Sequence, residues 1–376
     1  MRVLIHVQHL LGIGHLQRSA LIARALAAAG AGVTLVSGGM PWPGLEIGGA
    51  RFVQLPPLRA GPGGFTDLIG TDGRTLGEAG RAERRQLVLA ALDAADPDAL
   101  LIETYPFGRR ALRFELEPLV AAARGRRRRP VIACSIRDIV AAKPDPARRA
   151  AIVGTLRASF DRLLVHADPR FIRLDESFPE APALADMLCY TGFVAPAAPP
   201  PAAPSGEILV SAGGGAAGAA LLKTAKAARD LSRHRGRTWR LIAGRNLPEE
   251  EFSALAQDLP PGLVLDRHRA DFHALLSGAA VSVSQAGYNT VAEVLQARVP
   301  AVFVPFAGGG ETEQTMRAER LQVLGLAVTA AEAALTPHGL AAAIDRAADP
   351  AAHGFDFDGA RRSAALLFAL AVGRRL

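Results

Sequence analysis

The sequence predicts an α/β protein with two nucleotide-binding-like domains, each built on a parallel sheet. The chain opens with a strand, a glycine-containing loop, a helix and another strand, which is the mononucleotide-binding arrangement. A second series of strands and helices begins at Glu207. Between the two series, residues 195–204 contain five prolines, which predicts a stiff polyproline-like connector. We therefore expect a first domain at 1–194, a linker at 195–205 and a second domain at 206–358.

The composition is typical of a globular enzyme. With 376 residues and 49% hydrophobic content, the chain can bury two cores. Its formal net charge is +7, and part of the excess lies in an arginine run at 124–129. Such a run suits an anionic surface, either a phosphate-rich ligand or membrane lipid, and it equally suits a solvated loop. We expect no nucleic-acid partner.

Cysteine content and hydropathy indicate a cytoplasmic location. Cys134 and Cys189 are the only cysteines, so neither a disulfide framework nor a four-cysteine metal site is expected. His6 and Gln8 interrupt the first apolar segment before a signal-peptide core could form. No apolar run approaches the roughly 20 residues that span a bilayer. Any membrane contact is therefore expected to be peripheral, on the inner face.

The first domain should place a loop at the carboxyl edge of its sheet. The pattern predicts a buried strand at Arg2–Gln8, a loop at His9–Gly14, a helix at Leu16–Ala29 and a strand at Gly32–Ser37. Ligands of such sheets bind at the carboxyl ends of the strands. The loop lies at this edge.

His15 is the candidate general base of this loop. An unperturbed imidazole titrates near neutrality and can take a proton from a hydroxyl or from water. Gly12 and Gly14 let the backbone approach a ligand, which makes Gly14 a candidate contact of the donor, and Arg18 lies one helical turn further. The alternative is that His15 caps the helix or bonds within the core.

The rest of the first domain continues the alternation of strands and helices. Residues 38–79 are rich in glycine and proline and include a long loop from Pro56, either a substrate lid or a flexible connection. The strand Ala99–Glu103 brings Glu103 to the same sheet edge, where its carboxylate would orient His15, bind an acceptor hydroxyl or cap the next helix. Further expected elements are a strand at 51–55, helices at 81–95 and 110–123, and strands at 131–135 and 162–166.

A glycine-rich turn opens the second domain. The expected strand Ile208–Ser211 leads into this turn and then into a helix that runs to about Arg233. Backbone N–H groups at a helix start suit a diphosphate. The acidic residue expected of a dinucleotide site is missing after the next strand, where an arginine and an amide suit a phosphate instead. The phosphate candidates are Gly213, Gly214, Gly215, Arg245 and Asn246.

Residues 280–320 combine the features of a ligand-binding unit. We expect a strand at Val281–Ser284, a turn at Gly287 that is free to take positive φ, and a helix capped by Asn289 or Thr290. Helical spacing places Asn289, Thr290 and Glu293 on one polar face, opposite an apolar face that can lie on the sheet.

A second strand, Val299–Pro305, leads into the loop Phe306–Thr312 and then to Glu313 and Gln314. Carboxylates and an amide at this place suit a hydroxyl-rich ligand. The alternative is that Glu293 is a solvated helix residue and that Glu311 and Glu313 favour a helix N-terminus.

These motifs resemble glycosyltransferase family 28, which includes the lipid II-forming N-acetylglucosaminyltransferase of peptidoglycan synthesis. The resemblance rests on Gly-x-x-Thr-x-x-Glu ending at Glu293, on Pro-Ala-Val-Phe-Val-Pro-Phe followed by a glycine loop and Glu-x-Glu-Gln, and on Gly-x-Gly-His at 12–15. It implies the GT-B architecture, two Rossmann-like domains facing each other across a cleft. It also implies that the last helix, within 359–376, packs back on the first domain.

The resemblance also implies functions for individual residues. Glu293 would bind the ribose hydroxyls of the nucleotide, and Glu313 and Gln314 would bind the donor sugar. The segment after the strand at 263–265 would hold the base, with His268 and Arg269 as its candidates. The histidine of the first loop would face the acceptor.

Together, these features predict an inverting, metal-independent glycosyltransferase that uses a nucleotide-diphosphate sugar, expected to be UDP-linked. The acceptor is a carbohydrate or a lipid-linked molecule. His15 would be the base, while the glycine turn, Thr290 and Arg245 would stabilise the departing diphosphate. No cofactor is expected. No metal site is expected either, because His6 and His9 cannot share a strand face and Asp358 precedes the final helix as a cap.

Three alternatives use the same architecture. In a nucleotide-sugar hydrolase, the histidine of the first loop would activate water. A nucleotide-sugar 2-epimerase would isomerise the donor, and a regulator would bind it without catalysis. The fold alone does not separate these functions.

Overall fold

The computed structural model describes residues 1–198, 203–213, 218–308 and 311–374. Packing divides the chain into two units. Unit 1 comprises Met1–Ala195 and Phe355–Leu376, and unit 2 comprises Pro196–Gly354. The polypeptide therefore leaves unit 1, forms unit 2 and returns to unit 1.

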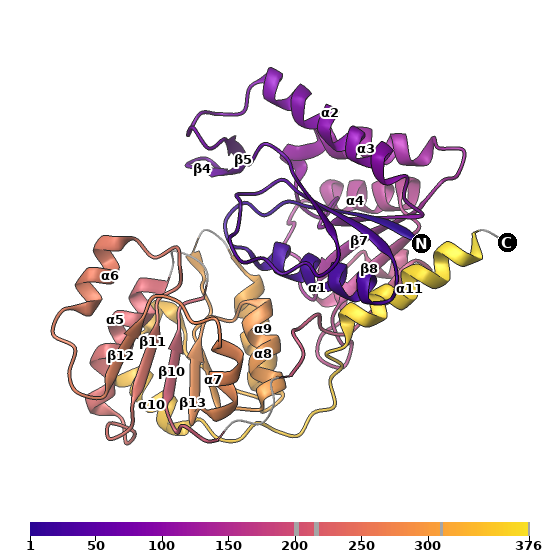
Figure 1. Cartoon of the computed structure of the whole chain (residues 1–376). Coiled ribbons are helices and arrows are strands. Elements are labelled where there is room, and N and C mark those ends of the chain that lie inside the picture. Colours follow the sequence, from indigo (N-terminus) through magenta and orange to yellow (C-terminus); the bar gives the residue numbers. More distant parts are fainter. Residues whose placement is uncertain (199–202, 214–217, 309–310, 375–376) are drawn as a thin grey trace. The chain divides into compact units, whose positions relative to one another are not determined.

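A parallel sheet forms the centre of unit 1 (Figure 1). In the described part of the unit it has seven strands, and all the neighbours pair in parallel. Most of these strands are apolar runs that are buried on both faces, as parallel sheets require. In sheet order the strands are β3 (Arg51–Gln54), β2 (Gly32–Ser37), β1 (Arg2–Val7), β6 (Ala99–Glu103), β7 (Val131–Arg137), β8 (Arg162–His166) and β9 (Leu188–Tyr190).

Helices cover both faces of this sheet, and alternate strand residues point to opposite faces. Val3, Ile5 and Val7 belong to the core under α1 (Gly14–Ala28) and α11 (Gly359–Gly373). Leu4 belongs to the core under the other group of helices. That group consists of α2 (Glu78–Ala95), α3 (Arg113–Arg124, after a 3-10 turn at Arg110–Leu112) and α4 (Pro146–Ser159).

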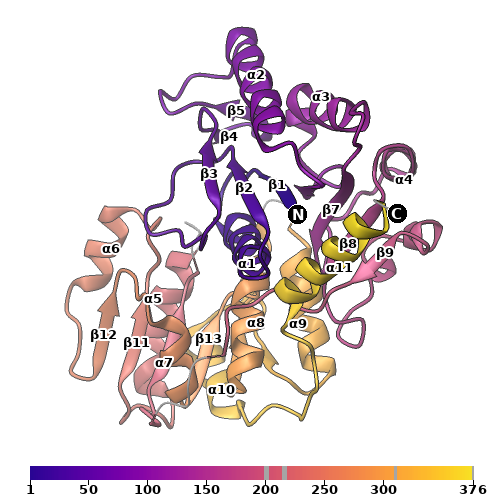
Figure 2. The ribbon, with the colours of Figure 1, turned by 45° about the vertical axis from the view of Figure 1, so that its right-hand side comes forward.

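The last helix of the chain, α11, lies beside α1 (Figure 2). Its Leu367 is buried in the same core as Leu16 and Leu26 of α1. Gly359 begins α11, and a Cβ at this position would lie 2.5 Å from the carbonyl oxygen of Gly192. Only glycine allows this close approach of the two backbones.

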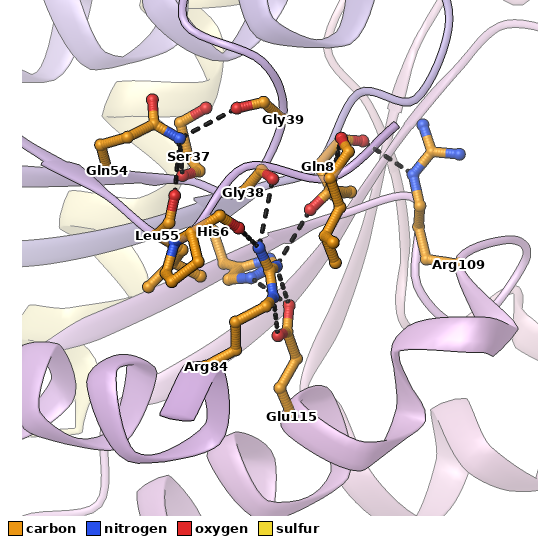
Figure 3. A network of polar contacts seen from close by, with 12 residues as sticks. His6, Gln8, Ser37, Gly38, Gly39, Gln54, Leu55, Arg84, Arg109 and Glu115 are labelled. Atoms are coloured by element: carbon orange, nitrogen blue, oxygen red, sulfur yellow. Dashed lines mark hydrogen bonds and ion pairs between the residues drawn. The ribbon is translucent and has the colours of Figure 1, made fainter. Parts of the chain in front are cut away.

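A buried network of polar side chains holds the loops at the carboxyl ends of β1 and β2 (Figure 3). Arg84 of α2 binds Glu115 of α3 through Nε and Nη2, each 2.7 Å from a carboxylate oxygen, and both side chains are fully buried. Arg84 also donates to Gln8 Oε1 at 3.1 Å and to the carbonyl of Gly38 at 3.2 Å. Gln8 in turn donates to the carbonyl of Leu58 at 3.1 Å. The buried ion pair therefore fixes three loops, those that contain Gln8, Gly38 and Leu58.

Unit 2 is a second parallel α/β structure. Its described residues form a six-stranded sheet with β12 (Leu263–Asp266), β11 (Trp239–Ile242), β10 (Ile208–Ser211), β13 (Val281–Ser284), β14 (Ala301–Phe303) and β15 (Val328–Thr329) in that order. Trp239 is fully buried in its core, which also contains Leu222 and Ile344. The helices are α5 (Ala219–Ala228), α6 (Glu249–Ala256), α7 (Phe272–Gly278), α8 (Tyr288–Ala297), α9 (Glu313–Val323) and α10 (Pro337–Arg346).

Several local expectations are wrong. The loop from Pro56 contains an antiparallel hairpin, β4 (Arg59–Gly61) and β5 (Gly64–Ile69), because Leu68 and Ile69 are apolar enough to be buried in unit 1. The helix expected from Leu16 already begins at Gly14. In unit 2, the strand expected to extend to Pro305 ends at Phe303, and the helix expected to reach Arg233 ends at Ala228, followed by a short 3-10 turn.

Among the described residues, no helix is both long enough and apolar enough to cross a membrane.

Candidate active site

Polar side chains gather where the central strands of unit 1 end. Glu103 is the last residue of β6, and its register partner on β7 is Ser135. His166 is the last residue of β8, the next strand of the sheet. His15 is the second residue of α1, which follows β1 at the same edge. The strand order therefore brings residues from four segments to one place.

His15 and Glu103 form a hydrogen-bonded pair. His15 Nδ1 lies 3.0 Å from Glu103 Oε1, and the side chains are 18% and 1% exposed. Arg18, one turn further along α1, binds the same carboxylate oxygen and is also buried. Thr104 Oγ1 lies 3.2 Å from Glu103 Oε1 and 3.2 Å from His15 Nδ1. Three donors thus converge on one oxygen of Glu103.

This arrangement determines the tautomer of His15. Arginine can only donate, and an ionised carboxylate can only accept. If Nδ1 carried a lone pair, it would face the carboxylate oxygen at 3.0 Å without a proton between them. Arg18 Nη2, which can only donate, lies 3.2 Å from Nδ1 and by itself would favour a lone pair there, but the contact with Glu103 is shorter. We therefore assign the proton to Nδ1 and the lone pair to Nε2. Nε2 has no hydrogen-bond partner in the part of the chain that the structure describes, so it can accept a proton from a ligand.

Burial and charge set the protonation states of this pair. Burial, followed by the nearby charge of Arg109, lowers the pKa of His15 to about 3, although Glu103 favours the charged form. Burial alone would raise the pKa of Glu103, but Arg18, His15 and Ser135 outweigh it and hold the pKa well below its usual range. At neutral pH, the site therefore contains a neutral imidazole and an ionised carboxylate. The near-neutral titration of an unperturbed histidine does not describe His15.

The loop after β6 has an unusual backbone. Thr104 has φ of 70° and Arg109 has φ of 62°, in the left-handed region that residues other than glycine rarely adopt. Arg109 Nε donates to the carbonyl of Gln8 at 2.7 Å, which ties this loop to the one after β1. Such conformations cluster at functional sites, and here they place Thr104 and Arg109 around His15.

In unit 2, the first candidate segment is the turn after β10. Gly213 has φ of +70°, and its N–H donates to Ser211 Oγ at 3.3 Å. The positive φ explains why glycine is needed at this position. Gly214 and Gly215 lie outside the described residues. Gly218, just before α5, packs so closely that a Cβ would lie 2.0 Å from the Cβ of Ala212.

The start of α8 differs from the sequence prediction. The N-cap residue is Gly287, with φ of −66° and an extended ψ of 145°, and no side chain caps the helix. Gly287 therefore does not use the positive φ that is open to glycine, and the expectation of a cap from Asn289 or Thr290 is wrong. Asn289 and Thr290 are the second and third helical residues, both half-buried. Space is open around the Cα of Gly287, where a Cβ would meet no described atom within 4 Å.

Glu293 lies one turn into α8 in a half-buried position. Within the described residues, its carboxylate has no ion pair or hydrogen bond that would compensate for the burial. Burial raises the pKa of Glu293 to about 7. A helix residue in full contact with water would keep its usual value, so the solvated alternative does not describe Glu293. Its carboxylate can still accept hydrogen bonds from a ligand.

The loop between β14 and α9 brings Glu313 and Gln314 to the helix start. Gln314 Oε1 accepts from the N–H of Phe306 at 3.1 Å, which fixes the beginning of the loop. Glu313 is the first residue of α9 and is 4% exposed. Glu311 Oε1 accepts from the N–H of Glu313 at 2.6 Å. Glu311 therefore stabilises the helix N-terminus, as the alternative for this residue proposed.

Four further candidates follow the outer strands β11 and β12. Arg245 and Asn246 are exposed in the turn after β11. Partial burial, followed by the charge of Arg245, lowers the pKa of His268, which places these two side chains near each other. Arg269 binds Asp271 at 2.6 and 2.8 Å. The charge of Arg269 is therefore already compensated within unit 2.

Each unit contains candidate residues that the sequence analysis did not single out. They are Arg18 as a partner of Glu103, together with Thr104, Arg109, Ser135 and His166 in unit 1, and Arg317 in unit 2. Arg317 is 1% exposed, and its Nη1 donates to the carbonyl of Ala286 at 2.7 Å, just before α8. One signal was available: Ser135 and His166 are polar residues near the ends of otherwise apolar strands.

Three arginines of the run after α3 lie close to aspartates. Arg126 binds Asp93 and Asp96. Arg129 lies 2.9 Å from Asp161, and Arg128 lies 3.9 Å from Asp98. Asp161 also binds Arg374, so these aspartates offset only part of the positive charge of the run.

Within the described ranges, no group of three or more His, Cys, Asp or Glu side chains is placed to hold a metal ion.

Sequence comparison relates unit 2 to a known family. Residues 209–365 match the glycosyltransferase family 28 C-terminal domain. Two similar proteins are UDP-N-acetylglucosamine--N-acetylmuramyl-(pentapeptide) pyrophosphoryl-undecaprenol N-acetylglucosamine transferases. The one from Thermotoga neapolitana is 35% identical over 68 residues, 18% of this chain and 20% of that protein. The one from Anaeromyxobacter sp. is 39% identical over 74 residues, 20% of this chain and 19% of that protein. The chain spans about a fifth of the length of these curated relatives.

Solved structures are similar to the chain over nearly its whole length. The calicheamicin glycosyltransferase CalG4 has a TM-score of 0.61 at 18% identity, covering 100% of this chain and 96% of that one. MurG of Acinetobacter baumannii has a TM-score of 0.57 at 17% identity, covering 100% and 95%. These similarities confirm the expected GT-B fold with two Rossmann-like domains.

Proposed function

The chain carries a glycosyltransferase family 28 C-terminal domain at residues 209–365, and we propose that the protein is an inverting, metal-independent glycosyltransferase. It would move a sugar from a nucleotide diphosphate, UDP in this proposal, to a hydroxyl group of an acceptor. The observation that carries the proposal is the 3.0 Å hydrogen bond between His15 Nδ1 and Glu103 Oε1. This bond leaves Nε2 of a neutral imidazole free to act as a base.

The reaction would be a single displacement at the anomeric carbon. The acceptor oxygen bonds to this carbon while its proton passes to His15 Nε2. The bond from the carbon to the diphosphate breaks, and its electron pair leaves with UDP. The ionised carboxylate of Glu103 stabilises the imidazolium that forms. Because the pKa of His15 is low, the proton moves late, when the forming bond has made the acceptor hydroxyl acidic.

Unit 2 would bind the donor. The carboxylate of Glu293 can accept hydrogen bonds from both ribose hydroxyls, and Glu313 and Gln314 would contact the sugar. Backbone N–H groups after β10 and at the start of α8 would meet the diphosphate, with Arg245 as a cation. The open space at Gly287 would let the diphosphate approach the helix start.

The acceptor class is a further part of the proposal. The names of the two relatives specify a UDP-N-acetylglucosamine donor and a pyrophosphoryl-undecaprenol acceptor. We extend to this chain the UDP-sugar donor and a lipid-linked acceptor, together with a peripheral position on the inner face of the membrane.

One experiment tests the proposal. Purified protein is incubated with a panel of UDP-sugars, with and without membrane extract and with and without a chelator, and UDP release is measured. We expect release that requires the extract and persists with the chelator, while a His15→Ala variant releases little UDP.

The other outcomes identify the alternatives. Equal UDP release without extract would indicate a hydrolase. A changed sugar without net transfer would indicate an epimerase, and UDP binding without turnover would indicate a regulator. A strict need for Mg²⁺ or Mn²⁺ would contradict the metal-independent mechanism.

A further inference from the structure

A second buried histidine lies behind Glu103. Ser135 Oγ lies 2.5 Å from Glu103 Oε2 and 2.8 Å from His166 Nε2. On the other side of the ring, His166 Nδ1 lies 2.8 Å from Thr191 Oγ1. Ser135 and His166 are fully buried, and Thr191 is 1% exposed. The reaction proposed above uses none of these three residues directly.

The hydrogen bonds of this chain can have only one direction. Glu103 is ionised, so its Oε2 must accept, and the single hydroxyl proton of Ser135 is donated to it. Ser135 Oγ must then accept from His166, which places a proton on Nε2. His166 Nδ1 therefore accepts, and the hydroxyl of Thr191 donates to it at 2.8 Å rather than to the more distant carbonyl of Gly192 at 3.2 Å. The reverse direction would leave two oxygen atoms 2.5 Å apart without a proton between them.

The two oxygens of Glu103 have different partners. Oε1 receives His15, Arg18 and Thr104, all from the side of the loop that would meet a ligand. Oε2 receives the chain of Ser135, His166 and Thr191 from the interior of the sheet. A carboxylate held on both oxygens cannot rotate about its last bond, so Oε1 stays aimed at His15 Nδ1.

We propose that Ser135 and His166 are positioning residues that hold Glu103 and thereby keep His15 in the tautomer with a free Nε2. Thr191 completes the chain by fixing the tautomer of His166. The importance of this tautomer for catalysis rests on the proposed function. The positioning itself does not rest on the proposed function, because the tautomer can be measured without turnover.

The direct test is the tautomer of His15, measured by long-range ¹H–¹⁵N correlation on protein labelled at histidine. Spectra of His15→Ala and His166→Leu identify the two signals. In the wild type, we expect His15 with its proton on Nδ1, His166 with its proton on Nε2, and no titration of either between pH 5 and 8. In Ser135→Ala and His166→Leu, the tautomer ratio of His15 should change about five- to tenfold, the effect of losing one buried hydrogen bond.

Two further variants separate positioning from packing. His166→Gln keeps an N–H group that can reach Ser135, so it should restore the wild-type tautomer of His15. Ser363→Ala is the matched control, because Ser363 is equally buried but donates to the carbonyl of Gly359 in α11. It should leave the His15 signal unchanged. If Ser135→Ala does not fold, the comparison of His166→Leu with His166→Gln decides the question.

Turnover gives a second readout. If the protein transfers sugar, kcat of Ser135→Ala and His166→Leu should fall roughly ten- to a hundredfold. This loss is part of the roughly 10²–10⁴-fold rate acceleration that a positioned base contributes. The Kd for UDP should stay unchanged. An identical His15 tautomer in the wild type, Ser135→Ala and His166→Leu would overturn the positioning role. A tautomer that responds as expected, in a protein that never transfers sugar, would instead overturn only the proposed function.

Discussion

Glu103 and Ser135 are register partners on the neighbouring parallel strands β6 and β7, and a hydrogen bond of 2.5 Å joins their side chains. The carboxylate that binds His15 is thus held by the sheet itself. Since α1 carries both His15 and Arg18, the pair depends on one helix and two adjacent strands. Glu103, Ser135 and Arg18 are all buried, and a base held by such contacts is preorganised for proton transfer.

The first prediction separates the roles of the two units. His15→Ala removes the proposed base but leaves unit 2 intact, so turnover should fall by roughly 10²–10⁴ while UDP affinity changes little. Glu293→Ala removes charge-assisted hydrogen bonds worth roughly 1.5–3 kcal/mol, so UDP should bind roughly ten- to a hundredfold more weakly. Titration calorimetry measures the UDP affinity of both variants, and an activity assay measures their turnover. If His15→Ala abolishes UDP binding, His15 is a phosphate ligand or a structural residue.

The second prediction concerns the pH dependence of donor binding. The pKa of Glu293 is raised to about 7 by burial, whereas that of His15 is lowered to about 3. Between pH 8 and pH 6, Glu293 gains a proton and His15 stays neutral. UDP affinity should therefore fall by up to about tenfold over this range, since the protonated carboxyl accepts fewer hydrogen bonds. Calorimetry at both pH values measures the change.

Glu293→Gln is the control for this pH dependence. Its UDP affinity should be nearly flat, apart from the titration of the terminal phosphate of UDP. If the wild type and Glu293→Gln have the same pH dependence, Glu293 does not contact the nucleotide.

The third prediction links the same residue to stability. Because burial raises the pKa of Glu293 from 4.5 to about 7, the folded state binds its proton more tightly than the unfolded state does. The free energy of unfolding therefore falls as the pH rises from 4.5 to 7, by at most about 3 kcal/mol. Glu293→Gln should be more stable than the wild type by roughly 1–3 kcal/mol at pH 8 and about equal at pH 4.5. Urea unfolding at both pH values checks this, and an equal gain at both would disprove the linkage.

The fourth prediction concerns the buried pair of Arg84 and Glu115. Arg84→Leu leaves the carboxylate of Glu115 buried without its arginine, so unit 1 should lose about 3–5 kcal/mol of stability. Arg24→Leu is the matched control, because Arg24 and Glu46 are 48% and 80% exposed and 3.3 Å apart. That pair should contribute at most about 1 kcal/mol.

Tryptophan fluorescence can follow unit 1 in this measurement. The chain has two tryptophans, Trp42 in unit 1 and Trp239 in unit 2, so Trp42 in a Trp239→Phe background reports on unit 1 alone. A loss below about 1 kcal/mol for Arg84→Leu would show that the network in Figure 3 adds little to stability.

The sequence predicts the sheet edge where His15 and Glu103 meet, since both positions follow from the strand and loop pattern. It does not predict that Arg18 and Thr104 reach the same carboxylate oxygen, because this depends on the exact orientation of α1 against β6. The strand order is also needed: β6, β7 and β8 are neighbours, and only this order aligns Glu103, Ser135 and His166. Sequence spacing alone contains no such information.

The missed hairpin and the wrong cap have simpler causes. The glycines and prolines around β4 and β5 are typical of a loop. The pairing of these two strands depends instead on the burial of Leu68 and Ile69. At α8, the preference of Asn289 and Thr290 for cap positions is real, but the helix begins earlier, directly after Gly287. The pKa shifts of His15 and Glu293 depend on burial, and neither has a signature in the local sequence.

The return of α11 to unit 1 has a consequence for synthesis on the ribosome. All residues of unit 2 are made before Phe355–Leu376, which complete unit 1. Until Leu367 arrives, the core around Leu16 and Leu26 of α1 lacks the side chains that α11 contributes to it. Unit 2 can therefore reach its final form first, although it is second in the chain, and the unit that carries His15 is completed only after all of unit 2 has been made.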